Sequence, residues 1–254
     1  MKSIIRLILN YIPRTILTRA STFIKPIIRI YLSGNRYTDP IDGRSFRSFI
    51  PYGYNNVRKN ALSPSTYSLE RHRMLWLYLK NETDIFTKKI RLLHFAPEPA
   101  FHKIFKNCNN ISYDTIDLNS PLAEIKADIC DLPIENDTYD YILCNHVLEH
   151  IDDDIKAMSE LYRVLKKGGI GIFQIPIDIE RKNTFEDPSI TSPKQRNKIF
   201  GQYDHVRIYG MDYFDRLKSV GFSVNQIYYG EKLSEEEIFK YCLSKNEIIP
   251  VCKK

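Results

Sequence analysis

Residues 137–178 limit the folds open to this chain more than any other stretch, because they alternate strand, helix and strand signals. Tyr139–Cys144 is an apolar run of strand length, and the acids at 152–154 can cap a helix and favour its positive end. Apolar side chains then recur every three or four residues, which is typical of one buried helix face, until Gly168 ends the helix. Ile170–Ile175 is a second apolar strand. A crossover of this kind predicts a parallel sheet that binds ligands at the carboxyl ends of its strands.

The positive charge of the chain is concentrated near its N-terminus. The formal net charge is +6, but residues 1–38 hold seven Lys and Arg residues and no acid, so the remaining 216 residues carry −1. A basic tail on a slightly acidic main domain argues against a broad nucleic-acid groove, and no nucleic-acid partner is expected. The five cysteines form no CxxC pair, which predicts reduced thiols in a cytoplasmic protein.

Residues 1–32 alternate apolar clusters with single cations. No uncharged apolar run approaches the roughly 20 residues that span a bilayer, and cations interrupt any signal-peptide core. The segment is predicted to form basic amphipathic helices that lie at an anionic membrane surface, which predicts a cytoplasmic protein held peripherally at the inner membrane face. The alternative, a helical extension that packs on the domain or on a partner, stays open.

The rest of the chain divides at residue 68. Residues 33–67 are rich in turn signals and are predicted to be irregular, whereas helix and strand signals alternate over residues 68–254. These signals predict strands at Ile90–Phe95 and Ile111–Leu118 and a last edge strand at Ile248–Val251. Residues 179–203 are polar, and their length predicts a lid or substrate loop.

Polar residues stand at the ends of successive predicted strands. Asp117 closes the second strand, where a carboxylate accepts hydrogen bonds from both hydroxyls of a ribose. Asp128 follows a short strand at 124–127, where its side chain and the backbone N–H of Ile129 can read an adenine edge. Asn145 and His146 follow the central strand. Acids are common turn residues, so it is the ordered set that points to a nucleoside site.

Residues 128–176 resemble the core of class I S-adenosylmethionine-dependent methyltransferases of the type 11 kind. The matching motifs are D-x-x-x-LP-(I/F), (F/Y)D-x-(I/V), (V/L)LEH and E-(L/I)-x-RVLK-x-GG. The resemblance runs from about residue 90 to 230, and implies an α/β, Rossmann-like sheet of seven strands, the last antiparallel, with S-adenosyl-L-methionine as cofactor. By position it implies contacts to the ribose from Asp117, to the adenine from Asp128 and Ile129, and to the methionine and methyl end from Asn145 and His146. Leu118 is also a predicted cofactor contact.

The loop after the first strand departs from that family. Where the family has an acid and two glycines, this chain has His94-Phe95-Ala96-Pro97-Glu98. Glycines allow close approach of the backbone to a ligand, so the cofactor is expected to sit differently here. The predicted cofactor contacts are His94, Phe95, Ala96 and Glu98, with His94 or Glu98 at the amino-acid part of the methionine.

The same loop, together with Gly201–Gly210, resembles a subgroup of uncharacterised bacterial methyltransferases. Members of that subgroup carry paired CPxCG and CPxC elements, similar to a zinc ribbon, before the helix at 68–80. Here the corresponding positions are Asp39, Asp42, Ser63 and Thr66, whose oxygens do not hold structural zinc as thiolates do. No metal is expected there, and the hairpins are predicted to persist on packing alone.

One further motif competes with this interpretation. His146, Glu149 and His150 fit H-x-x-E-H, a zinc-protease signature that requires both histidines on one helix. Here the first histidine ends a predicted strand, so a metalloprotease is not expected and no metal ligand is assigned.

Catalysis is assigned to two histidines and an arginine. If a hydroxyl accepts the methyl group, a base of near-neutral pKa helps, and His205 and His146 are the candidates, with His205 preferred. Arg207, beside it, suits an anionic acceptor. Asp204–Arg207 could equally be a salt-bridged helix start with no catalytic part.

The sequence therefore predicts a methyltransferase acting on a small-molecule, glycan or lipid-linked acceptor. The main alternative is a catalytically silent binding module that keeps the fold, which the missing glycines support. A nucleotide-binding oxidoreductase is a third hypothesis, but it would need the glycine fingerprint even more.

Overall fold

The structure is a computed structural model, and it describes residues 25–53 and 57–254. The chain divides into two compact units. The N-terminal unit comprises Met1–Trp76 and Leu233–Ser244, and the sheet unit comprises Leu77–Lys232 and Lys245–Lys254. The boundary falls inside helix α3 (Glu70–Glu82), close to the expected division at residue 68. Sequence signals alone did not place 233–244 with the N-terminal segment.

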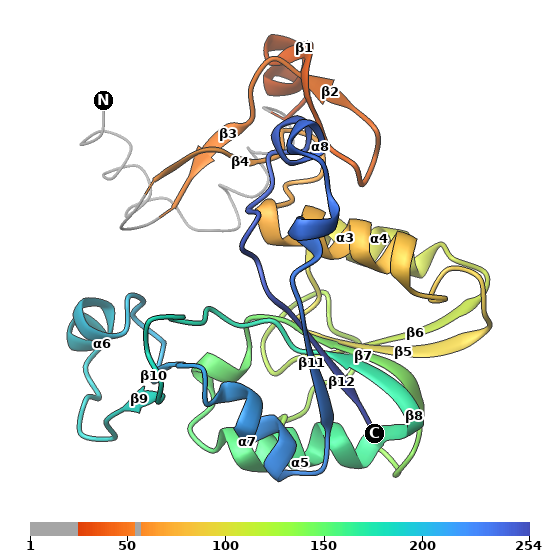
Figure 1. The fold of residues 1–254 in the computed structure, drawn as a ribbon. Helices are drawn as coiled ribbons and strands as arrows, with labels where there is room; N and C mark the ends of the chain where they lie inside the picture. Colours follow the sequence, from red (N-terminus) through yellow and green to blue (C-terminus); the bar gives the residue numbers. More distant parts are fainter. Residues whose placement is uncertain (1–24, 54–56) are drawn as a thin grey trace. The chain divides into compact units, whose positions relative to one another are not determined.

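The sheet unit is built on one six-stranded sheet in the order β11-β12-β8-β7-β5-β6 (Figure 1). The strands are β5 (Ile90–Phe95), β6 (Ile111–Ile116), β7 (Tyr139–Cys144), β8 (Leu165–Ile172), β11 (Ser223–Ile227) and β12 (Ile249–Lys253). Strands β5 to β8 pair in parallel, whereas β12 is antiparallel to both β8 and β11. The predicted α/β sheet with an antiparallel last strand is confirmed.

Two details of the predicted sheet differ from the structure. The expected short strand at 124–127 appears only as an isolated parallel bridge between Ile116 and Ile125, so the sheet has six strands where seven were expected. The prediction of a last strand at the edge is wrong, because β12 lies between β8 and β11. Its four buried residues, Ile249 to Cys252, agree with this central position.

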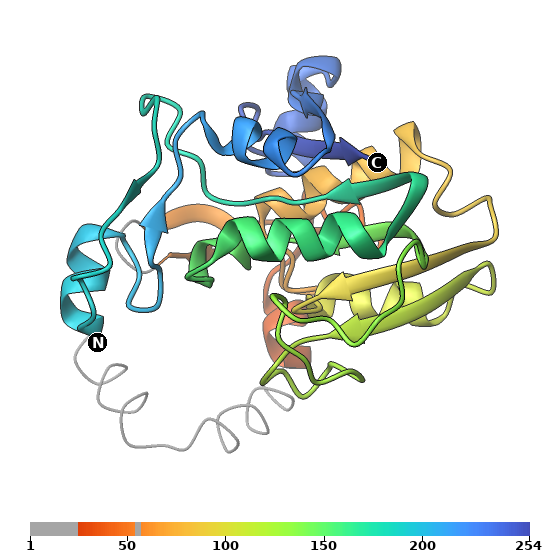
Figure 2. The ribbon, with the colours of Figure 1, turned by 90° about the horizontal axis from the view of Figure 1, so that it is seen from below.

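Helices cover both faces of this sheet. α4 (Pro99–Lys106) lies on one face, and α5 (Asp154–Val164) and α7 (Tyr213–Ser219) lie on the other, as Figures 1 and 2 show. Between α5, α7 and the strands lies the main apolar core, which includes Ile142, Leu161, Phe173 and Phe214. This packing holds the carboxyl ends of β5, β6 and β7 in fixed positions.

The central helix begins at the predicted acids but ends earlier than expected. Asp153 caps α5, because its side chain accepts a hydrogen bond from the backbone N–H of Lys156 at 2.9 Å. The helix ends at Val164 and Leu165 already pairs with Tyr139, so the predicted continuation to Gly168 is wrong. Gly168 instead takes a positive φ of 76° inside β8, where the register with β7 shifts. The glycine therefore makes a bulge rather than a helix stop.

The polar segment at 179–203 is not a plain loop. It contains β9 (Phe185–Glu186) and α6 (Pro193–Ile199), and β9 pairs with β10 (Arg207–Ile208). Two short 3-10 helices complete the unit: η1 (Leu148–His150), directly after the β7 end, and η2 (Tyr229–Lys232).

The N-terminal unit contains two antiparallel pairs, which corrects the prediction that residues 33–67 are irregular. β1 (Ser33–Thr38) pairs with β2 (Ser45–Phe46), and β3 (Ile50–Tyr52) pairs with β4 (Arg58–Leu62). Helix α8 (Glu235–Lys240) belongs to the same unit and opens with the predicted capping box between Ser234 and Glu237.

The membrane prediction for residues 1–32 lies largely outside the described residues, which begin at 25. Residues 25–31 are helical, and Ile27, Ile30 and Tyr31 expose most of their side chains. Arg29 in this helix donates to the carbonyl oxygen of Ser65 at 2.7 Å. Within the described ranges, no helix combines the length and apolar character needed to cross a bilayer.

The four positions that the sequence comparison matched to zinc-ribbon cysteines lie in or beside a hydrogen-bonded cluster. Asp39 is fully buried and accepts hydrogen bonds from Thr66 Oγ1 at 2.5 Å and from Ser68 Oγ at 3.1 Å. Ser65 Oγ donates to Asp42 at 3.2 Å and lies 3.1 Å from Ser63 Oγ. Polar side chains thus link the two turns, so the expectation that packing alone holds the hairpins is wrong.

Candidate functional site

The candidate site lies where three parallel strands end together. Phe95 at the end of β5 is in register with Ile116 at the end of β6 and with Cys144 at the end of β7. The residues that follow each strand, Ala96, Asp117 and Asn145, therefore stand in a row along one edge of the sheet. The predicted grouping of these strand-end residues is borne out by the register.

The glycine-free loop after β5 reproduces a glycine-like turn with alanine. Ala96 has a φ of 44°, in the left-handed region that L-residues seldom adopt. Its N–H donates to the carbonyl oxygen of Ile116 at 2.9 Å, which ties the loop to the end of β6. The loop thus turns without the expected glycine, at the expense of backbone strain at one residue.

Glu98 is the polar residue that this loop presents to the row. Asn145 Nδ2 donates to Glu98 Oε1 at 3.2 Å, and the other carboxylate oxygen pairs with Nε2 of His94. His94 is fully buried, and its Nδ1 lies 2.9 Å from the hydroxyl of Tyr113. Burial raises the pKa of Tyr113 well above its ordinary value and keeps the phenol protonated. The buried ring of His94 therefore holds the carboxylate of Glu98 in place. The buried ring of Phe95 belongs to the apolar core.

Asp117 keeps one carboxylate oxygen available at the end of β6. Its Oδ1 accepts hydrogen bonds from the backbone N–H groups of Asn119 at 2.6 Å and Ser120 at 2.5 Å. Its Oδ2 makes no hydrogen bond within the part of the chain that the structure describes. The neighbouring Leu118 is 58% exposed, so an apolar surface lies next to a free acceptor. Ribose hydroxyls and a purine ring need these two features side by side.

Asp128 and Ile129 follow the Ile125 bridge beside β6. Asp128 is exposed and its Oδ1 accepts from the N–H of Cys130 at 2.9 Å, while the side chain of Ile129 lies in the core. Glu160 and Arg163 of α5 hold the next turn, because Leu132 N–H donates to Glu160 at 2.8 Å and Arg163 donates to the Leu132 carbonyl oxygen at 2.9 Å. The segment that would carry the adenine is thereby fixed to the scaffold.

Asn145 and His146 end the central strand in a rigid arrangement. Asn145 is 4% exposed and its Oδ1 accepts from Gln174 N–H at 3.2 Å. His146 has a φ of 55°, and its N–H donates to the Gln174 carbonyl oxygen at 2.7 Å. Its ring Nδ1 lies 3.2 Å from Glu149 Oε1, and its buried Nε2 has no partner among the described residues. A ring nitrogen is thus left unpaired at the predicted methyl end.

The segment after β7 also meets His205. The rings of His150 and His205 are T-shaped with centroids 4.8 Å apart, and Val206 N–H donates to the Glu149 carbonyl oxygen at 3.0 Å. Burial lowers the pKa of His205 below its ordinary value, although the charge of Glu149 opposes this shift. Burial opposes ionisation of Glu149, but the hydrogen bond and charge of His146 and the charge of His150 outweigh it and lower the pKa of Glu149.

Arg207 is a structural residue in this arrangement. Its side chain is 3% exposed and donates to Glu186 at 2.8 Å, to the carbonyl oxygen of Asp152 at 2.8 Å, and to the carbonyl oxygens of Leu148 and Ile151. The prediction that Arg207 faces an anionic acceptor finds no support here. The guanidinium instead fixes the turn that carries Glu149 and His150.

Sequence reasoning missed three residues of this site. Gln174 holds both Asn145 and His146, Tyr113 supports His94, and His150 stands against His205. The H-x-x-E-H pattern was the available signal for His150. It was set aside because a helix was required, whereas the structure brings the same residues together on a strand end and a 3-10 turn.

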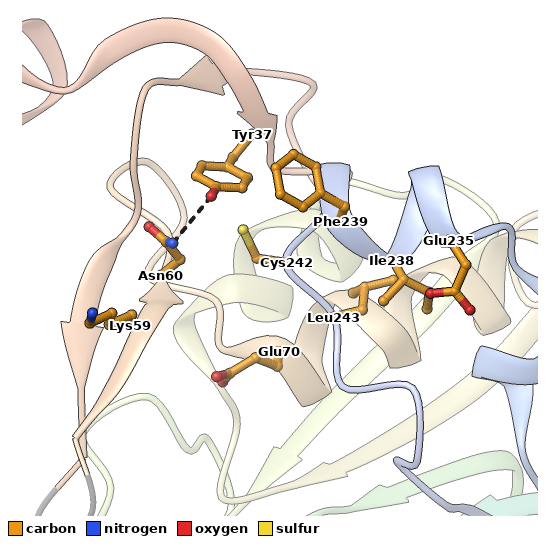
Figure 3. A pocket seen from close by; sticks show the side chains of 9 residues that line it. All are labelled: Tyr37, Lys59, Asn60, Glu70, Glu235, Ile238, Phe239, Cys242 and Leu243. Carbon is orange, nitrogen blue, oxygen red and sulfur yellow. Dashed lines mark hydrogen bonds between the residues drawn. The ribbon is translucent and has the colours of Figure 1, made fainter.

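A cavity in the N-terminal unit is a second candidate, with a volume of about 400 Å³. Its lining mixes polar and apolar side chains (Figure 3): Tyr37, Lys59, Asn60, Glu70, Glu235, Ile238, Phe239, Cys242 and Leu243. Burial raises the pKa of Cys242 to about 12, so its thiol is not a nucleophile at neutral pH. None of the predicted site residues lies in this lining.

Comparison with known proteins shows which family part of the sheet unit resembles. Residues 90–173 match the family model described as a methyltransferase domain. The match covers less than half of the chain and includes the ends of β5, β6 and β7. It supports a class I methyltransferase domain with S-adenosylmethionine as its cofactor. The strand-end acceptors and the exposed Leu118 of this structure fit the ribose and base of that cofactor.

The stretches of similar sequence are short, and they belong to proteins that are described as uncharacterised. Two uncharacterised proteins of Methanocaldococcus jannaschii, MJ0638 and MJ1123, are 41% identical over 76 residues and 30% identical over 92 residues. These stretches cover 28% and 36% of this chain, and only 33% and 42% of those proteins. The similarity thus concerns less than half of this chain and less than half of each relative.

Solved structures are similar at low identity. A methyltransferase from Archaeoglobus fulgidus has a TM-score of 0.47 at 15% identity, covering 72% of this chain and 94% of that one. A putative sarcosine dimethylglycine methyltransferase from Galdieria sulphuraria has a TM-score of 0.48 at 14% identity, covering 87% and 91%. At TM-scores below 0.5, these likenesses add nothing to the argument from the family match.

Proposed function

We propose that this chain is an S-adenosylmethionine-dependent methyltransferase. The observation that carries the proposal is the row of residues at the in-register ends of β5, β6 and β7: Glu98 and Ala96, then Asp117, then Asn145 and His146. A nucleoside bonded to an amino acid needs acceptors for ribose hydroxyls, an apolar surface for the base and a carboxylate for the ammonium group. The row offers each of them.

The role of each residue in binding the cofactor is assigned from its polar atoms and its neighbours in the structure. Asp117 Oδ2 accepts hydrogen bonds from the ribose hydroxyls, and Leu118 packs against the adenine ring. The edge of the adenine forms hydrogen bonds with Asp128 and the N–H of Ile129. Glu98 binds the ammonium group of the methionine part, held in place by His94 and Asn145. When bound, the cofactor supplies an electrophilic methyl group, and these residues align and desolvate it.

The acceptor is proposed to be a hydroxyl group. When bound, S-adenosylmethionine would supply the methyl group and leave as its demethylated thioether, and a histidine of the site would accept the proton that the hydroxyl loses. The geometry favours His146 over His205, because His146 has an unpaired Nε2 while Glu149 holds its Nδ1. A carboxylate that orients an imidazole in this way is a recurrent device for proton transfer.

The acceptor class rests on the basic N-terminal segment. Seven cations without an acid over residues 1–38 favour an anionic membrane surface, and Ile27, Ile30 and Tyr31 are exposed on the helix at 25–31. We therefore propose a glycan or lipid-linked acceptor, reached by an enzyme held peripherally at the membrane. The hydrogen bonds from Arg29 to the carbonyl oxygens of Ser65 and Pro64 favour the alternative, in which this helix packs on the N-terminal unit.

A specific observation favours a second candidate, a silent binding module. Glu98 is already paired with His94 and Asn145, and the first loop lacks glycine. If these contacts close the methionine subsite, the fold persists without catalysis. The silent module and the enzyme differ in whether a methyl group moves.

Label transfer tests the proposal. The full chain is incubated with S-adenosylmethionine carrying a tritiated methyl group and with polar and lipid extracts of a strain that lacks the gene. Tritium is expected in one extract component. Asp117→Ala is expected to raise the KM for S-adenosylmethionine about 10- to 100-fold through the lost ribose hydrogen bonds, whereas the exposed Asp215→Asn leaves it unchanged. Cofactor binding without label transfer from any extract would favour the silent module.

A further inference from the structure

Three metal-ligating side chains converge beside the methyl end of the site. A carboxylate oxygen of Glu149 and one ring nitrogen each of His150 and His205 all lie within 4.8 Å of one another. Glu149 and His150 come from η1, which directly follows the β7 end, and His205 comes from the segment before β10. Two imidazoles and one carboxylate are a donor set that first-row divalent cations prefer.

The backbone holds the two halves of the cluster together. Val206 N–H donates to the Glu149 carbonyl oxygen at 3.0 Å, and His150 Nδ1 lies 3.2 Å from the Asp204 carbonyl oxygen. Arg207 donates to the carbonyl oxygens of Leu148 and Ile151, on either side of the two η1 ligands. Hydrogen bonds to main-chain groups therefore position the cluster, and one of them involves the ring of its own His150. The buried Arg207 therefore helps to position Glu149 and His150.

One carboxylate oxygen of Glu149 is buried without a hydrogen-bond partner among the described residues. The residue is 2% exposed, Oε1 is paired with His146 Nδ1, and Oε2 has no hydrogen-bond partner among the described residues. A buried polar group without a hydrogen bond destabilises the folded state, and a charged group does so more strongly. A cation at the cluster would satisfy this oxygen, with His146 as the outer partner that orients the ligating carboxylate.

We propose that Glu149, His150 and His205 bind one first-row divalent cation such as Mn²⁺, Fe²⁺ or Zn²⁺. Three protein ligands leave coordination positions open for oxygen atoms of another molecule. This site differs from the helical H-x-x-E-H pattern, because His146 orients the carboxylate and His205, from a distant segment, replaces it as a ligand. The expectation that the chain binds no metal was drawn from sequence alone, where His205 has no visible link to residues 149 and 150.

The open positions indicate how the acceptor would bind. Resting on the proposed function, this part assigns the acceptor to molecules with two adjacent oxygen ligands, such as a vicinal diol or a hydroxyl beside a carboxylate. A hydroxyl bound to a divalent cation loses its proton more readily. His205 is then a metal ligand, and His146 remains the proton acceptor.

Cobalt titration of the full chain tests the site. The protein is stripped with a chelator and titrated with Co²⁺, and the visible absorption of a coordinated ion is expected to saturate at one ion per chain. Glu149→Gln, His150→Ala and His205→Ala are each expected to weaken binding at least 10-fold, and His146→Gln about 10-fold through the lost orientation of Glu149. His102→Ala, a half-exposed histidine on α4 outside the cluster, is the matched control and should bind as the parent does.

The outcomes separate the metal site from the proposed function. No saturable absorption up to millimolar Co²⁺, or binding unchanged in Glu149→Gln and His205→Ala, would overturn the metal site. Circular dichroism and calorimetry with S-adenosylmethionine on the same variants show whether fold and cofactor binding persist. A protein that binds the cofactor but not Co²⁺ refutes the metal site alone, and one that binds Co²⁺ but transfers no methyl group refutes the proposed function alone.

Discussion

Ala96 shows at the level of one residue how the chain replaces an expected glycine. The sequence indicated a departure from the usual loop, but it did not indicate that alanine would adopt a φ of 44°. A backbone angle of this kind depends on the hydrogen bond from Ala96 N–H to Ile116, which connects residues far apart in the chain. His150 was missed for the same reason, since its neighbour His205 lies 55 positions away.

The strain at Ala96 leads to a stability prediction. Left-handed backbone costs an L-residue about 1–2 kcal/mol, while glycine loses about 0.5–1 kcal/mol more on folding than alanine. Ala96→Gly is therefore expected to leave the free energy of unfolding unchanged or raise it by up to about 1.5 kcal/mol. The control Ala100→Gly, inside α4, should lower it by about 1 kcal/mol. Urea unfolding compares the two, and equal losses would contradict a strained Ala96.

At the level of elements, the strands were more predictable than the helix ends. β5 and β7 have the predicted bounds because runs of mostly apolar residues mark buried strands. The end of α5 and the central position of β12 were mispredicted, because a bulge at Gly168 and the order of strands in a sheet are set by pairing with distant residues. The four short strands within residues 33–67 were not predicted either, because turn signals dominate that segment and the pairing of its strands is not visible in the sequence.

The start of α5 gives a direct test of capping. Asp153 accepts from Lys156 N–H, whereas the side chain of Asp152 makes no such contact with the described residues. Asp153→Ala should lower the free energy of unfolding by about 1 kcal/mol, and Asp152→Ala by less than about 0.5 kcal/mol. Thermal unfolding measures both variants. Equal effects would show that general acidity near the helix start, rather than the cap, matters.

The link between α5 and the turn after Asp128 depends on pH. The hydrogen bond from Arg163 lowers the pKa of Glu160 below its ordinary value of 4.5 in the folded chain. A carboxyl with a lowered folded-state pKa stabilises the fold above its unfolded pKa, and this contribution is lost as pH falls through the folded value. Glu160→Gln should therefore be less stable than the parent by about 1.5–3 kcal/mol at pH 7, with the gap closing below pH 4.5. A gap that does not change with pH would contradict the ionised link.

At the scale of the whole molecule, the chain returns from the sheet unit to complete the N-terminal unit. Arg73 is fully buried and donates to the carbonyl oxygens of Tyr241 and Cys242, at 2.7 Å each, and to that of Ala61 at 3.0 Å. Sequence signals place α8 after the last crossover, and they do not indicate that Arg73 bonds to the residues directly after this helix. Burial of one guanidinium thus links segments 168 and 169 positions apart.

Removing this link should loosen both segments together. Arg73→Met leaves several buried carbonyl oxygens unpaired and is expected to lower the free energy of unfolding by more than about 3 kcal/mol. Hydrogen exchange should quicken in 57–76 and in 233–244 alike. The control Arg58→Met removes an exposed ion pair with Glu70 and should cost less than about 1 kcal/mol. Faster exchange in 57–76 alone would contradict the joint unit.

The proposed membrane attachment is tested on the full chain. Cosedimentation with anionic vesicles is expected at low salt and should be lost in the double variant Arg6→Glu, Arg14→Glu. The control Lys167→Glu, Lys253→Glu carries the same charge change on exposed lysines of the sheet unit and should still sediment. Equal loss in both variants would indicate a general charge effect and remove the proposed anchor.

Cofactor binding at the strand ends is the central claim, and isothermal titration calorimetry with S-adenosylhomocysteine, the demethylated product, tests it most directly. The account predicts saturable binding at one molecule per chain, weakened about 10- to 100-fold in Asp117→Ala and unchanged in Asp215→Asn. No heat of binding at millimolar ligand, or equal affinity in Asp117→Ala, would contradict it.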